Sequence, residues 1–115
     1  MKHRYKNLKI WELGIQIADK VFSVLETFPK EEKFGLISQI SRCSISIPSN
    51  IAEGSAGTNK SFSYFLSIAL GSSFELETQL IISKNRNYLQ IEDFNKLESM
   101  IHEFQKMTIG FKKSL

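Results

Sequence analysis

The side chains best suited to chemistry form a polar set in the middle of the chain: Arg42, Asn50, Glu53, Glu75 and Glu77. Glu53 and Glu75 are expected on neighbouring helices, and two such carboxylates can act as general acid–base partners. The same carboxylates can instead accept hydrogen bonds from Arg42, Asn50 or helix-terminal amides. Because no histidine lies near them in the sequence, we favour a structural polar network of Arg42, Asn50, Glu53 and Glu75. A hydrolase or a small ligand-binding protein that uses Glu53 and Glu75 is the alternative.

The other chemical groups do not match a catalytic, cofactor or metal site. A di-iron bundle needs Glu-x-x-His on two helices, but Ser99 stands three residues before His102, and His3 lies in a basic segment. Glu98 and His102 are four residues apart and are interpreted as an exposed pair on one helix. Cys43 falls on an apolar helical row, where a free cysteine acts as a small hydrophobic residue. We therefore predict that the protein is not an enzyme and has no cofactor.

The charge of the chain is concentrated at its start. The net charge is +3, and four basic residues precede the first acid, Glu12. The other basic residues are nearly balanced by acids, so basicity belongs to a short flexible tail, residues 1–7, and to Lys9 just after it. This tail can contact nucleic acid. The single cysteine excludes an internal disulfide, and no apolar stretch is long enough for a membrane span, so we expect a cytoplasmic protein.

Apolar residues in the first half of the chain repeat every three or four positions, as they do in α-helices. The first helix is expected to stop at Phe28, because the residue before a proline is pushed out of helical geometry. It carries two adjacent rows, a main row (Leu8, Trp11, Ile15, Ala18, Phe22 and Leu25) and a secondary row (Ile10, Ile17, Val21 and Val24). The second helix is expected over residues 31–55, bent near Pro48 and ended by Gly54 and Gly57.

Two more helices follow in the second half. Thr58 or Asn59 can cap the third helix, which should end near residues 85–87. Its inner row is Phe62, Leu66, Ala69, Ser73, Leu76 and Leu80. The fourth helix carries a heptad seam of Phe94, Leu97, Ile101, Phe104, Thr108, Phe111 and Leu115.

Four helices joined by short loops predict an all-α, antiparallel up-down four-helix bundle that occupies residues 1–115 as a single domain. The secondary row of the first helix, together with Met100 and Met107 beside the seam of the fourth, exceeds what one internal face needs. Apolar faces of this width are typical of an oligomer interface. We therefore expect the protein to associate with itself.

Several segments resemble a known family. They are LKIW at residues 8–11, FPKEEKFGL at 28–36, QISR at 39–42, IPSNIAEG at 47–54, FLSIALGS at 65–72 and ELETQL at 75–80. Together they are similar to the four-helix-bundle proteins encoded in intervening sequences of bacterial 23S ribosomal RNA genes, the S23-type proteins. The resemblance implies a cytoplasmic bacterial protein without catalytic activity that assembles into a ring, typically of five subunits.

The resemblance also implies partners. Accessory variability proteins of retroelements are similar in fold, bind nucleic acid through basic surfaces and partner a reverse transcriptase. By this comparison the chain is expected to bind RNA or DNA, and a reverse transcriptase or a ribosomal component is a possible partner. The expected nucleic-acid contacts are the early basic residues and the two cations of the motif region: Lys2, Arg4, Lys6, Lys9, Arg42 and Lys60.

Overall fold

Four α-helices and two short 3-10 helices make up most of residues 3–115, the part of the chain that this computed structural model describes. The chain begins with η1 (Tyr5–Asn7) and α1 (Lys9–Leu25). It continues with η2 (Lys30–Glu32), α2 (Leu36–Gly54), α3 (Asn59–Asn85) and α4 (Ile91–Lys113). The prediction of an all-α fold is confirmed.

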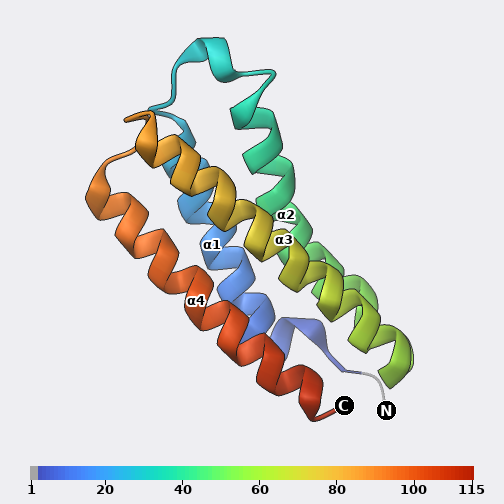
Figure 1. Cartoon of the computed structure of the whole chain (residues 1–115). Helices are drawn as coiled ribbons and strands as arrows, with labels where there is room; N and C mark the ends of the chain where they lie inside the picture. The colour runs from blue at the N-terminus through green and yellow to red at the C-terminus, as the bar shows by residue number, and fades with distance from the viewer. Residues whose placement is uncertain (1–2) are drawn as a thin grey trace.

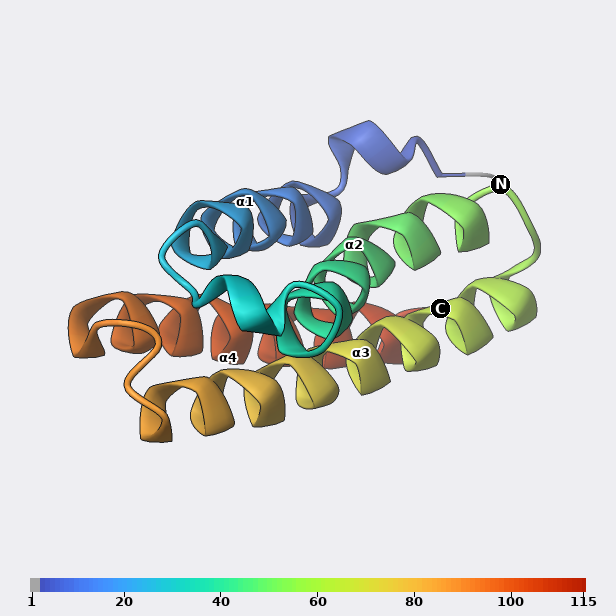
Figure 2. The ribbon, with the colours of Figure 1, turned by 90° about the horizontal axis from the view of Figure 1, so that it is seen from above.

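The helices alternate in direction, so that both ends of the chain lie at one end of an elongated bundle of 45 × 24 × 19 Å (Figure 1). Each helix packs against its neighbours in sequence, and α4 closes the bundle against α1. The pairs α1–α3 and α2–α4 therefore lie diagonally. Seen from above, α1 and α3 lie on opposite sides of the bundle (Figure 2). This arrangement is the predicted antiparallel up-down four-helix bundle.

The core is built from the predicted rows of α2, α3 and α4. Its fully buried members include Ile40, Ile47, Ile51, Phe62, Leu66, Leu76, Leu80, Leu97, Ile101 and Phe104. In α1 the prediction was reversed. The secondary row, Ile10, Ile17, Val21 and Val24, is buried throughout. Of the expected main row, only Ala18 and Leu25 are buried, whereas Leu8, Trp11 and Ile15 are half-buried and Phe22 is exposed.

Close contact between α1 and α2 explains which row of α1 turns inward. Gly14 faces α2, and a Cβ built on it would lie 3.3 Å from Ile47 Cγ2 and 3.4 Å from Pro48 Cβ. Pro48 itself is buried, and α2 continues through it. Because Gly14 has no side chain, the face of α1 that carries it can approach α2 closely, and its flanking residues Leu13 and Ile17 become core. The bend expected at Pro48 stays a prediction.

The start of α2 differs from the prediction. Residues 30–32 form the separate 3-10 helix η2, and α2 begins five residues later than expected, at Leu36. Gly35 interrupts helical geometry, with φ of −112° and ψ of −106°. The Glu32 side chain holds this interrupted segment in place. Its Oε1 accepts a hydrogen bond from the Leu36 amide (3.3 Å), and its Oε2 accepts one from the Tyr88 hydroxyl (3.0 Å).

The turn between α2 and α3 also has a different cause from the one expected. Neither Gly54 nor Gly57 has a positive φ, so left-handed capping does not explain them. A Cβ on Gly54 would lie 2.6 Å from the Cβ of Phe65 in α3, so this glycine permits close helix approach. The predicted cap of α3 is confirmed, because the Thr58 Oγ1 accepts from the Ser61 amide at 3.1 Å.

Candidate subunit and nucleic-acid interfaces

The surface residues of α1 form an apolar groove with α2. This outer groove has a volume of about 410 Å³ and is lined by Tyr5, Trp11, Ile15, Ala18, Asp19, Phe22, Ile45, Pro48, Ser49 and Ala52. Phe22 is 43% exposed and Ile45 is 47% exposed. Asp19 is the single charged residue in this lining. The surplus apolar surface that the sequence predicts on the first helix is therefore present. It is formed by the main row of α1, which was expected to be internal, and not by the secondary row.

The segment before α1 frames the outer groove. Residues 3–7, expected to form a flexible tail, instead contact the bundle. The Tyr5 ring meets the Trp11 ring edge-on, with centroids 5.3 Å apart. His3 contacts the rings of Phe62 and Phe111 at 5.3 and 5.6 Å, and its amide donates to the Ser55 carbonyl. These aromatic contacts attach the N-terminal segment to α3 and α4.

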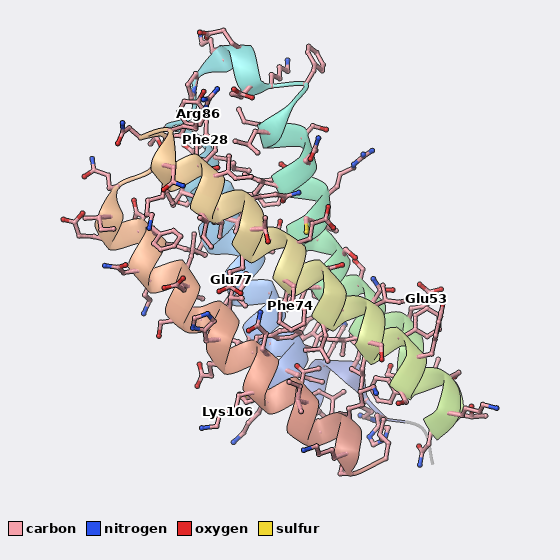
Figure 3. All side chains as sticks on the ribbon, viewed as in Figure 1. Phe28, Glu53, Phe74, Glu77, Arg86 and Lys106 are labelled. Atoms are coloured by element: carbon pink, nitrogen blue, oxygen red, sulfur yellow. The ribbon has the colours of Figure 1, made fainter. Side chains whose placement is uncertain are left out.

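Basic residues lie together at the end of the bundle where the N-terminal segment packs. Arg4, Lys6 and Lys9 are exposed there, and Lys60 lies in the first turn of α3. The alternation of helix directions adds the end of α4, whose lysines sequence reasoning did not identify: Lys106, Lys112 and Lys113. We call these seven residues the basic end; Lys106 is labelled in Figure 3.

The lysines of α1 and α4 meet at one site of the basic end. Lys9 and Lys106 line the same hollow of about 410 Å³, together with Met107, Gly110 and Phe111. The cations therefore come from segments almost a hundred residues apart. Of the other expected contacts, Arg42 is exposed on α2 beside a different groove. Lys2 lies outside the described residues.

The expected polar network is only partly formed. Its centre is Ser46, which the sequence prediction did not include. The Nδ2 of Asn50 donates to the carbonyl and to the Oγ of Ser46 (2.8 and 2.9 Å), and the Ser46 and Ser72 hydroxyls are 2.8 Å apart. Asn50 therefore helps to hold α2 against α3 through two serines, and not through the carboxylates that the sequence predicted as its partners. Among residues 3–115, Glu53 forms no side-chain hydrogen bond with this network, since it is exposed on the outside of the bundle (Figure 3).

Arg42 and Glu75 are brought together along a polar groove of about 320 Å³ that Cys43 also lines. They form no ion pair within the described part of the chain, and Glu75 accepts a hydrogen bond from Gln79 at 3.3 Å. The Cys43 thiol donates to the Ser72 carbonyl. Burial, together with the negative charge of Glu75, raises the pKa of Cys43 from 9.0 to about 12. This thiol is therefore un-ionised at neutral pH and unsuited to act as a nucleophile.

The carboxylate-pair hypothesis does not fit this geometry. Glu53 precedes Gly54, which meets Phe65, and Glu75 lies ten residues beyond Phe65 on α3. At 1.5 Å per residue this places the two carboxylates about 15 Å apart along the bundle. At this separation they cannot share a proton or a water molecule, so Glu53 and Glu75 are not general acid–base partners.

One helix, α3, is long and apolar enough to cross a membrane by length and composition, with a mean hydropathy of 1.2 over its most apolar window. A third of that window is buried within the bundle.

Comparison with known proteins identifies the family. A family model described as 23S rRNA-intervening sequence protein matches residues 6–110. The chain belongs to this family. It is also similar to the crystal structure of a protein of unknown function from the S23 ribosomal protein family of Bacteroides thetaiotaomicron, with 25% identity and a TM-score of 0.82. That match covers 90% of this chain and 98% of the other. Among curated proteins the comparison found no match.

The family assignment agrees with the resemblance carried by the sequence segments, and the structural match agrees with the fold. Neither comparison attaches an activity to these intervening-sequence proteins. The relation to retroelement accessory proteins stays a prediction.

Proposed function

We propose that this intervening-sequence protein is a non-catalytic, cytoplasmic, homo-oligomeric scaffold that contacts nucleic acid. The observation that carries the proposal is the outer groove, an exposed apolar surface at which α1 and α2 turn aromatic and aliphatic side chains outward. Exposed apolar surfaces of this kind mark sites of protein association. A second copy of the chain is the proposed occupant.

A second apolar surface supports a ring rather than a simple dimer. Phe74 is 51% exposed on α3, and Ile81, seven residues later, lies on the same helix face. Because α3 is diagonal to α1, this α3 face and the outer groove are different surfaces of one subunit. A subunit that joins two different surfaces to its neighbours makes a head-to-tail contact, which forms a ring when the rotation between subunits closes and an open filament when it does not. The family resemblance sets the expected size at about five subunits.

The mass in solution tests self-association. Light scattering after gel filtration is expected to give about 66 kDa, five times the 13.2 kDa of one chain. Phe22→Asp in the outer groove and Phe74→Asp on the α3 face should each yield smaller species with unchanged helix content. Phe34→Asp is the matched control, since Phe34 is 90% exposed and lies in neither surface. A wild-type protein that remains monomeric at about 100 µM contradicts the proposal.

Mixing the two interface variants tests the head-to-tail arrangement. Phe22→Asp leaves the α3 face intact, and Phe74→Asp leaves the outer groove intact. An equimolar mixture should therefore form a mixed dimer through the one remaining good junction. If the mixture stays monomeric, the two surfaces do not join each other and the ring proposal is wrong.

The basic end is the proposed nucleic-acid contact, because it combines cations from the N-terminal segment, α3 and α4. Ring assembly would repeat this end around a rim and strengthen weak individual contacts. Labelled single-stranded RNA and duplex DNA should bind with an affinity that falls steeply with salt. Exchange of Lys6, Lys9 and Lys106 for Gln should weaken binding and reduce the salt slope by about 0.7–0.9 per lost phosphate contact.

The control variant for nucleic-acid binding lies at the opposite end of the bundle, where Lys30 and Lys33 are exposed in the loop between α1 and α2. Their exchange for Gln removes positive charge without touching the basic end. We expect it to change affinity much less than the basic-end variant. The basic-end variant removes three charges and the control removes two, so equal losses per removed charge would show that binding depends on net charge alone and contradict the assignment to the basic end.

A further inference from the structure

Three metal-binding side chains meet between α3 and α4, beside the exposed α3 face of Phe74 and Ile81. They are Glu77 of α3 and Glu98 and His102 of α4, and one donor atom from each lies within 4.8 Å of the other two. Glu77 lies on the side of α3 that faces α4 (Figure 3). The sequence suggested only the Glu98–His102 pair; the structure adds a third donor from another helix.

The Glu77 carboxylate is held in position by its neighbours. Its Oε2 accepts a hydrogen bond from His102 Nε2 at 2.6 Å, and its Oε1 accepts from Gln105 Nε2 at 3.3 Å. Gln105 is in turn near the Ser73 hydroxyl of α3, at 3.2 Å. The carboxylate is thus oriented with one oxygen toward the imidazole, as hydrogen bonds from neighbouring side chains orient the ligands of metal sites.

Within residues 3–115, no lysine or arginine pairs with the two carboxylates of this cluster. Glu98 is half-buried and forms neither an ion pair nor a side-chain hydrogen bond within residues 3–115. The only ion-pair partner of Glu77 in the same range is His102. Two carboxylates that converge on one imidazole, with no lysine or arginine paired to them, provide a local negative potential that a bound cation would neutralise.

We propose that Glu77, Glu98 and His102 bind a divalent transition metal, with Zn²⁺ as the best fit. Carboxylate oxygen and imidazole nitrogen are both ligands of Zn²⁺, whereas the imidazole disfavours Mg²⁺ and Ca²⁺. This proposal does not depend on self-association or nucleic-acid binding.

The distances suit one Zn²⁺ ion after small side-chain rotations. Ligand bonds of about 2.0–2.2 Å in a tetrahedral site set donor atoms about 3.3 Å apart. Glu77 and His102, now 2.6 Å apart, must therefore separate slightly, and Glu98, with a donor atom within 4.8 Å of both, is within reach of the same ion. His102 is 54% exposed, so its ring is free to rotate. In a neutral imidazole the proton moves from Nε2 to Nδ1, which frees the Nε2 lone pair for the metal, and water completes the coordination.

Titration of ZnCl₂ into the full-length, tag-free protein tests the site, with affinity measured by calorimetry or by competition with a chromophoric chelator. One Zn²⁺ per chain is expected. His102→Ala and Glu98→Gln should each weaken binding about tenfold or more, and Gln105→Ala should weaken it less because Gln105 only positions Glu77. Zn²⁺ should also raise the midpoint of thermal unfolding of the wild type and leave that of His102→Ala unchanged.

Two control variants separate this site from adventitious binding. Glu103→Gln removes an exposed acid of α4 outside the cluster, and His3→Gln removes the other histidine of the chain. Both should bind Zn²⁺ as the wild type does, with circular dichroism confirming that every variant remains helical. The proposal is overturned if the wild type binds no Zn²⁺ at about 100 µM, or if His102→Ala binds as tightly as the controls.

Discussion

Replacement of Gly54 by alanine tests whether the close packing of α2 against α3 requires a glycine at this position. A Cβ at this position would lie 2.6 Å from Phe65 Cβ and 3.0 Å from Phe62 Cδ1. Carbon atoms in good contact are about 3.5–4.0 Å apart. The Cβ of Phe65 is fixed to its backbone, so rotation of a side chain cannot relieve the overlap. The two helices must separate at this end of the bundle.

The expected loss of stability follows from two opposing effects. Overfilling a well-packed site costs about 1–3 kcal/mol, and an overlap between two backbone-attached atoms belongs at the upper end of that range. Replacement of glycine by alanine gains at most about 1 kcal/mol in a helix, and less at its last residue, where Gly54 stands. The free energy of unfolding should therefore fall by about 2 kcal/mol, which corresponds to a decrease in Tm of about 6–12 °C.

Urea denaturation followed by circular dichroism measures this difference, at several protein concentrations so that a change in assembly is detected. Gly110→Ala is the matched control, because Gly110 is exposed in α4 and a Cβ there would have no atom within 4 Å. It should stabilise the protein by about 0.5–1 kcal/mol through helix propensity alone. If Gly54→Ala is as stable as the wild type, or shifts stability in the same direction as Gly110→Ala, the close-approach explanation is wrong.

Three further predictions concern individual contacts. Ser46→Ala should lower the unfolding free energy by about 1–2 kcal/mol, because it removes the hydroxyl that links Asn50 to Ser72. Exposed Ser49→Ala should change it by less than about 0.5 kcal/mol in urea denaturation. Thr58→Ala should cost about 1 kcal/mol by the same measurement, through loss of the α3 cap. Cys43 should react with iodoacetamide at pH 8 about two to three orders of magnitude more slowly in the folded than in the urea-unfolded protein. Glu75→Gln should speed the folded reaction, because removal of the negative charge lowers the thiol pKa; an unchanged rate would exclude that charge as a cause.

The sequence predicted the inner faces of α2, α3 and α4 because each carries one dominant apolar row with unbroken helical spacing. It failed for α1 because two neighbouring rows are both periodic and both apolar. Periodicity identifies a face but not the direction in which that face points. That direction depends on Gly14, whose missing side chain matters only once α2 is known to lie beside it.

In the candidate sites, too, features within one segment were predictable from the sequence, whereas features that join two helices were not. The basic residues near the N-terminus were found because they are adjacent in sequence. Lys106 and its neighbours in α4 were not, because only the alternation of helix directions brings them to the same end. Similarly, the spacing of Glu98 and His102 is visible within one helix, whereas the contribution of Glu77 depends on the register between α3 and α4. Local spacing was predictable, and pairing between helices was not.

The order in which the helices pack also bears on how fast the chain folds. Each of the first three junctions joins helices that follow one another directly, so the loops that must close are short. Among the contacts between α1, α2, α3 and α4, only that of α4 with α1 spans most of the chain, and Lys20 and Asp93 form one of its links, at 2.9 Å. A topology dominated by local contacts folds on the microsecond-to-millisecond scale. Closure of α4 onto α1 is then the step with the greatest loss of chain entropy, which makes α4 the helix expected to join the folded structure last.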